Sequence, residues 1–152
     1  MNKKKSTMRA VDELATATDF TPLKLGTPIR VVIADDERDT AMTLGILLRS
    51  EGFDVQLVHN GTSVATTVGR HRPHAVLLDI GMPDRSGYDV AKELRAAYGA
   101  QCPVLIAVTG RASPADRDEA RASGFKYYVT KPYNPGQLMR LLSTLSPAAA
   151  TA

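Results

Sequence analysis

Short apolar runs alternate with amphipathic stretches along the chain from Ile29 onward. The runs are rich in β-branched residues, and most are continuous, which is typical of strands buried on both faces of a parallel sheet. The pattern predicts such strands at 29–34, 75–79, 103–108 and 125–130. One more segment, 54–58, alternates between apolar and polar residues, as an edge strand with one solvated face does.

Each predicted strand is followed by a helical pattern. In the first, the apolar residues recur at helical spacing and the helix ends at Glu51–Gly52; these residues are Ala41, Leu44, Leu47 and Leu48. Further helices are predicted at 63–70, 88–97, 113–123 and 134–145. Strands and helices that alternate at this spacing require right-handed crossovers. We therefore predict an α/β fold, a doubly wound five-stranded parallel sheet with five helices.

The two ends of the chain lie outside this pattern. Residues 1–28 show no sustained periodicity, so we expect a flexible leader, in which 9–16 is a candidate short helix. Residues 29–146 form the predicted domain, and 147–152 are expected to be a disordered tail.

The charge distribution argues against a nucleic-acid-binding domain. The formal net charge is +3, but residues 1–28 contribute five Lys and Arg against three Asp and Glu. Residues 29–152 hold fourteen against thirteen, so the predicted domain is almost neutral and its charges are interspersed. We therefore expect a solvated surface rather than a nucleic-acid interface.

Cysteine use and hydropathy indicate the compartment. Cys102 is the single cysteine, which excludes an intrachain disulfide and favours a buried or half-buried structural thiol. No apolar stretch approaches the ~20 residues of a membrane span, and no apolar segment of a secretory signal follows the basic residues at 3–5. A soluble cytoplasmic protein is predicted. Three histidines lack the spacing of metal ligands and are expected at the surface: His59, His71 and His74.

Polar side chains stand at the carboxyl ends of four predicted strands. Asp35 and Asp36 follow the first, Asp79 ends the next buried one, and Thr109 and Lys131 follow the last two. Because such ends meet at one edge of an open α/β sheet, we expect these residues to lie together. Three carboxylates so close repel one another and favour a hard cation, Mg²⁺ or Mn²⁺. Simpler alternatives are a turn at Asp79, a helix cap at Asp35 or Asp36, and a solvated Lys131.

This combination of groups suits phosphoryl chemistry. A carboxylate such as Asp79 can attack phosphorus and form an aspartyl-phosphate. A divalent cation and Lys131 would neutralise the phosphoryl oxygens, and Thr109 could afterwards donate a hydrogen bond to one of them. That new contact would shift an equilibrium between two loop positions.

The motifs resemble the receiver domain of bacterial two-component response regulators. The resemblance covers Ile29 to Leu145 and implies a flavodoxin-like sheet of strand order 2-1-3-4-5. The residues that carry it are Asp35–Asp36, Leu77–Pro83 with Gly87, Val108–Gly110 and Tyr128–Pro132.

By this resemblance, Asp79 is the phosphoacceptor. Thr109 and Lys131 are the implied phosphate contacts. The implied metal site comprises Asp36, Asp79 and the backbone carbonyl of Gly81, with Asp35 acting through water or by orienting the ion.

The resemblance also implies switch, tuning and structural positions. Tyr128 matches an aromatic switch that turns inward when Thr109 is drawn to the phosphate, although a half-buried strand tyrosine is the simpler alternative. Gly81 and Arg111 occupy positions that tune the lifetime of the phosphoryl group. The implied structural residues are Pro83 and Gly87, which shape the loop, and Pro132, which follows a cis peptide bond.

The expected function is that of a stand-alone phosphoacceptor signalling protein. A histidine kinase or a histidine phosphotransfer protein would be the donor, and an unidentified protein would bind the switched surface or receive the phosphate. Seven residues follow Leu145, so no output domain is expected. We expect no enzyme activity beyond self-catalysed phosphorylation and dephosphorylation. The alternatives are a phosphate-independent interaction module and, less favoured, a flavodoxin-like enzyme or a phosphohydrolase.

Overall fold

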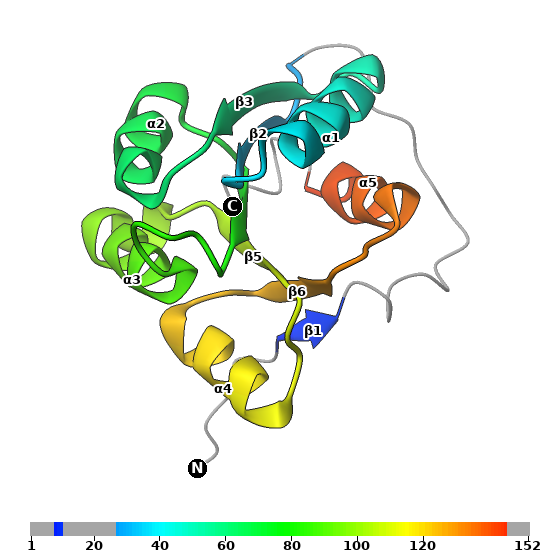
Figure 1. Cartoon of the computed structure of the whole chain (residues 1–152). Helices are drawn as coiled ribbons and strands as arrows, with labels where there is room; N and C mark the ends of the chain where they lie inside the picture. The colour runs from blue at the N-terminus through cyan, green and yellow to red at the C-terminus, as the bar shows by residue number, and fades with distance from the viewer. Residues whose placement is uncertain (1–7, 11–26, 146–152) are drawn as a thin grey trace.

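The computed structural model describes residues 8–10 and 27–145, and Figure 1 shows a parallel sheet between two layers of helices. The sheet order is β1-β6-β5-β4-β2-β3, and every pairing is parallel. The five predicted strands are β2 (Arg30–Ala34), β3 (Asp54–Val58), β4 (Ala75–Asp79), β5 (Val104–Thr109) and β6 (Tyr127–Thr130). Counted alone they have the order 2-1-3-4-5, so the predicted fold class is confirmed.

The five predicted helices are present within a few residues of their expected bounds. They are α1 (Arg38–Ser50), α2 (Val64–His71), α3 (Gly87–Tyr98), α4 (Pro114–Ser123) and α5 (Pro135–Ser143), with 3₁₀ turns at η2 (Gly61–Ser63) and η3 (Gly99–Gln101). Local capping explains two of the starts. Ser113 and Asp116 form a capping box on α4, and the Asn134 side chain accepts hydrogen bonds from two backbone N–H groups of α5. Among the described residues, no helix is long and apolar enough to cross a bilayer.

Two apolar cores cover the two faces of the sheet. Alternate residues of β2 point to opposite sides, so Val31 and Ile33 join one core and Val32 joins the other. The first core also takes its side chains from α1 and α5, and the second takes them from α2, α3 and α4. The edge strand β3 alternates between exposed and buried residues over its first three positions, as predicted, and then continues with the half-buried Leu57 and the buried Val58. This packing places the carboxyl ends of β2, β4, β5 and β6 along one edge.

A sixth strand, β1 (Arg9–Ala10), was not predicted. It lies parallel to β6, with Arg9 opposite Tyr127 and Ala10 opposite Tyr128 (Figure 1). A helix beginning at residue 9 is therefore wrong for these two residues. The remaining residues of the candidate helix, most of the predicted leader and the predicted tail lie outside the described residues.

The amino ends of β2 and β4 hold a buried histidine, which corrects the expectation of a surface position. His74 is 7% exposed. Its Nδ1 accepts a hydrogen bond from the backbone N–H of Arg30 (2.9 Å), and the backbone N–H of His74 donates to the Arg30 carbonyl (2.8 Å). Burial, helped by the positive charge of Arg30, lowers the pKa of His74 from 6.5, so the ring is held neutral. Buried backbone groups at the strand ends need such a partner.

Candidate functional site

Three carboxylates meet at the carboxyl ends of β2 and β4. Asp35 and Asp36 follow β2 directly, and Asp79 is the last residue of β4. Each offers an oxygen, and these oxygens all lie within 4.8 Å of one another. Asp35 and Asp79 are buried, whereas Asp36 is exposed. The sheet thus brings together residues that are more than forty positions apart in the sequence.

Lys131 is the cation next to these carboxylates. Its Nζ lies 3.3 Å from Oδ2 of Asp79 and 3.9 Å from Oδ2 of Asp35. Burial alone would lower the pKa of Lys131, but the charges of Asp79 and Asp35 outweigh it and raise the pKa. Burial also raises the pKa of Asp35 to about 6, against the opposing hydrogen bond that Asp35 accepts from the Glu37 N–H.

The donor set fits a hard divalent cation. Carboxylate oxygens are the ligands that Mg²⁺ prefers, and three negative charges beside one ammonium leave an excess that such an ion would balance. Helix capping does not account for the cluster. The N-cap of α1 is Glu37, whose side chain makes no capping bond, and Asp35 accepts the N–H of that residue. The N–H of Gly81 donates to Oδ1 of Asp79 (3.0 Å), while its carbonyl as a ligand stays a prediction.

Thr109 ends β5 next to the acidic cluster. Asp79 pairs with Val108, so Thr109 is one position further toward the edge. Its hydroxyl accepts a hydrogen bond from the Arg111 N–H (2.9 Å), and its carbonyl accepts one from the Lys131 N–H (2.8 Å). Thr109 is therefore linked by its backbone to the residue that supplies the ammonium.

Tyr128 is buried in β6, with its hydroxyl held by α4. Nη1 of Arg117 donates to that hydroxyl (2.8 Å), and the guanidinium lies 5.5 Å from the ring centroid. Tyr128 and Thr109 both line a cavity of about 10 Å³, which has no room for a phenol ring. An inward turn of Tyr128 would therefore require a lining residue such as Thr109 to move.

The loop after Asp79 is anchored at two points. The carboxylate of Asp84 accepts hydrogen bonds from the N–H groups of Gly61 (2.8 Å) and Thr62 (2.9 Å). These bonds, the one from Gly61 first, lower the pKa of Asp84. At the other end, a Cβ on Gly87 would lie 2.7 Å from Cα of Ile80, so a glycine is needed for this close approach.

The remaining predicted positions have simple surroundings. Pro83 is exposed in this loop, and Arg111 is exposed after β5. The Lys131–Pro132 peptide bond is cis. A Cβ on Gly81 would lie 3.8 Å from Oδ1 of Asp79, an ordinary contact distance.

Sequence reasoning missed several residues near the site. His59 was expected only as a surface residue, yet its Nδ1 lies 3.1 Å from the carbonyl oxygen of Asp35. Asp84, Arg117 and Tyr133 were not singled out. No local pattern marks them, because their contacts join segments distant in the sequence.

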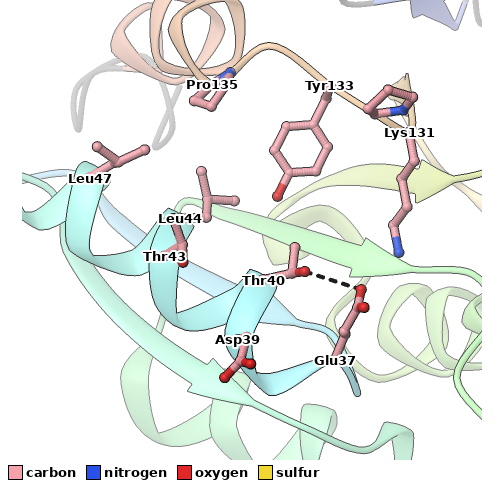
Figure 2. A pocket seen from close by; sticks show the side chains of 10 residues that line it. Glu37, Asp39, Thr40, Thr43, Leu44, Leu47, Lys131, Tyr133 and Pro135 are labelled. Atoms are coloured by element: carbon pink, nitrogen blue, oxygen red, sulfur yellow. Dashed lines mark hydrogen bonds between the residues drawn. The ribbon is translucent and has the colours of Figure 1, made fainter.

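A groove of about 600 Å³ opens beside the acidic cluster, between α1 and the segment that follows β6. Figure 2 shows Lys131 and Tyr133 facing the first turns of α1, where the Thr40 hydroxyl donates to Glu37 (3.1 Å). Acidic and polar side chains line the end near Lys131, and apolar ones line the other end. The lining residues are Glu37, Asp39, Thr40, Thr43, Leu44, Leu47, Lys131, Pro132, Tyr133 and Pro135.

Comparison with known protein families identifies the family of this chain. The response regulator receiver domain family matches residues 31–143. The chain belongs to this family. Among solved structures, the CheY-like response regulator receiver domain of Methylobacillus flagellatus has a TM-score of 0.68 at 27% identity and covers 79% of this chain and 100% of its own. The chemotaxis protein CheY4 of Vibrio cholerae (TM-score 0.73, 22% identity, 79% of this chain and 100% of CheY4) shares the fold.

Curated relatives of this receiver domain are longer proteins. The DNA-binding response regulator MtrA of Mycobacterium tuberculosis H37Rv is 36% identical over 110 residues, which are 72% of this chain and 47% of MtrA. The sensory transduction protein RegX3 of Mycolicibacterium smegmatis is 40% identical over 109 residues, 72% of this chain and 46% of RegX3. The chain therefore spans about half the length of the curated relatives it matches.

Proposed function

We propose that this receiver domain accepts a phosphoryl group on Asp79 from a phosphohistidine donor and thereby switches a protein-binding surface or relays the phosphate. One observation carries the proposal: the buried Asp79 carboxylate lies beside two further carboxylates and 3.3 Å from the Lys131 ammonium. Strand ends whose polar groups served only to hold the fold together would not place like charges next to one another.

In the proposed transfer, an oxygen of Asp79 forms the new P–O bond. The P–N bond to the donor imidazole breaks, and its electron pair stays on that nitrogen. The ammonium of Lys131, which is ion-paired with Asp79, then contacts the phosphoryl oxygens that carry the negative charge. Asp36, Asp79 and the carbonyl of Gly81 would hold a Mg²⁺ or Mn²⁺ ion, with Asp35 acting through water or by orienting it, and the ion would supply positive charge.

The proposed switch begins at Thr109. Its hydroxyl accepts from the Arg111 N–H and keeps its own proton free to donate to a phosphoryl oxygen. A shift of Thr109 opens space beside Tyr128, whose ring then turns inward and changes the surface formed by α4 and β6. In this proposal, the side chain of Arg111 and the absence of a side chain at Gly81 affect how fast the phosphoryl group is lost to water.

The donor protein docks, in this proposal, against α1. The groove shares Lys131 with the acidic cluster, so a protein seated there is next to Asp79. Met42 and Ile46 are 52% and 58% exposed on the same helix and offer an apolar contact. A histidine kinase or a histidine phosphotransfer protein is the donor of matching chemistry.

The proposed role is in cytoplasmic signalling, not in turning over a separate substrate. MtrA is named as DNA-binding, but its match to this chain spans 47% of its length. The charges of the described domain are interspersed, which supports a protein rather than nucleic acid as the downstream partner.

Labelling with a small donor tests the proposal. The full chain is incubated with acetyl phosphate and Mg²⁺, and intact mass spectrometry is expected to detect one added phosphoryl group. Asp79→Asn should abolish the adduct, as should EDTA. Asp118→Asn, an exposed acid on α4, is the matched control and should label normally. Labelling that persists unchanged in Asp79→Asn would reject the site.

A further inference from the structure

The outer edge of β6 carries a segment that the fold does not require. β1 is two residues long and covers the first half of β6, opposite Tyr127 and Tyr128 (Figure 1). An uncovered edge strand presents N–H and C=O groups with which another chain can pair. β1 occupies that position with the chain's own backbone.

Within residues 8–10 and 27–145, two kinds of contact attach this segment. Its two paired residues lie along β6, and the half-buried Met8 packs against the core on the side of α2, α3 and α4, which includes Tyr128. Short terminal segments with few contacts open at low free energy while the rest of a domain stays folded. The segment can therefore leave β6 without unfolding the sheet.

Tyr128 connects this edge with the candidate site. On one side it lies opposite Ala10 of β1, and on the other it lies opposite Ala107 of β5. Three residues further on, the Lys131 N–H donates to the Thr109 carbonyl (2.8 Å). A shift of Thr109 therefore acts on the same strand that β1 covers.

The side chain of Tyr128 strengthens this connection. Arg117 holds its hydroxyl, and the adjoining cavity of about 10 Å³ cannot admit the ring in the present arrangement. A turn of the ring into that cavity would change its packing within the core that Met8 contacts, because Ala107 and Ala120 line the cavity and belong to this core. The packing around Met8 thus includes a side chain that moves in the proposed switch.

We propose that residues 8–10 form a cover strand that occupies the edge of β6 in the unphosphorylated protein and leaves it when Asp79 is phosphorylated. The inference rests on the proposed function and names the surface which that site regulates. The uncovered edge fits an extended segment of a partner protein, added as a further strand. Because coupling is reciprocal, loss of the cover strand favours phosphorylation of Asp79.

The test compares two substitutions at one position in the full chain. Ala10→Pro removes a backbone N–H and fixes a φ that suits a strand poorly, whereas Ala10→Ser keeps the N–H. Hydrogen exchange of the amides of Tyr127 to Thr130 is followed by NMR, and melting temperatures verify the fold. In Ala10→Pro we expect about tenfold faster exchange of the amides on the covered edge, with Ala10→Ser close to wild type.

Phosphorylation is examined in the same samples. Wild-type protein labelled by acetyl phosphate, with the adduct verified by mass, is expected to show the fast exchange of Ala10→Pro. Ala10→Pro is expected to label about threefold faster than Ala10→Ser, through reciprocal coupling.

Each negative result has a distinct meaning. Equal exchange in wild type and Ala10→Pro would overturn the cover strand itself. Unchanged exchange in wild type that carries the phosphoryl mass would overturn its release. If no adduct forms, the proposed function and the phosphate-driven release fail together, while the comparison of the two Ala10 variants still decides whether β1 covers the edge.

Discussion

Buried polar groups lie at both ends of β2 and β4, but their surroundings differ between the two ends. At the amino ends, His74 is neutral and makes two hydrogen bonds with the backbone of Arg30. At the carboxyl ends, Asp35 and Asp79 lie beside a third carboxylate, with the ammonium of Lys131 as their cation. In the first arrangement, Nδ1 and the backbone N–H of His74 both find partners in the backbone of Arg30, whereas the second arrangement concentrates like charge. The difference indicates which cluster maintains the sheet and which one is suited to a ligand.

The largest effect is expected on the ligand side, at Lys131. Lys131→Met should slow labelling by acetyl phosphate about 10²-fold, because removal of one preorganised contact to a developing charge costs about that much. The rate is measured from intact mass against time. Lys126→Met, which removes an exposed lysine just before β6, is the matched control. Labelling of Lys131→Met at the wild-type rate would contradict the phosphate contact.

At the amino ends of β2 and β4, substitution of His74 should change the stability of the fold but not the rate of labelling. His74→Leu leaves the Arg30 N–H without its acceptor and should lower the free energy of unfolding by about 2 kcal/mol. Urea denaturation measures this change, and His74→Asn, which can still accept a hydrogen bond, should recover part of it. Because the pKa of His74 is lowered from 6.5 in the folded state, the unfolded chain takes up the proton first. This stabilisation is therefore complete above about pH 6.5 and is lost as the pH falls.

The acidic cluster should show the reverse dependence on pH when no metal is present. The pKa of Asp35 is raised from 3.8 to about 6, so the folded state holds the proton more tightly between these values. Stability should then fall as the pH rises through that range, and Asp35→Asn should remove the slope. At pH 7 in EDTA the variant should be about 1 kcal/mol more stable than wild type, allowing for screening by solvent. A less stable variant under these conditions would argue against charge repulsion at this site.

The smallest effect is expected at Gly81. A Cβ there lies 3.8 Å from Oδ1 of Asp79 without a clash. Gly81→Ala should therefore leave stability within about 0.5 kcal/mol of wild type and slow the loss of the phosphoryl group about twofold, because a methyl group excludes some water from the carboxyl. Decay of the adduct after removal of acetyl phosphate measures the change. Faster decay in Gly81→Ala would contradict the expectation that a methyl group at this position slows loss of the phosphoryl group.

Much of the fold could be predicted because its signals are local. The continuous run that ends at Asp79 identifies a central strand, and the alternation in 54–58 identifies an edge. The cap at Ser113 marks the start of α4. The same logic located the carboxyl ends of the strands, which is why Asp35, Asp79 and Lys131 could be grouped before their distances were known.

The unpredicted features depend on contacts between distant segments. Two residues are too few for β1 to show a period, and Arg9 gives no signal that it pairs with a strand more than a hundred residues away. His74 has the sequence context of a turn, and its burial follows from the pairing of β2 with β4. Asp84 is one of many loop acids until the fold brings Gly61 and Thr62 to it.

The parallel register has one further consequence. Asp35, Asp79, Thr109 and Lys131 stand at the ends of four separate strands, and these become neighbours when β2, β4, β5 and β6 are paired in order. A nascent or damaged copy that has not completed this pairing would lack the assembled cluster on which the proposed phosphorylation depends. Phosphorylation, as proposed, would therefore require the whole domain to be folded. Incompletely folded copies would transmit no signal.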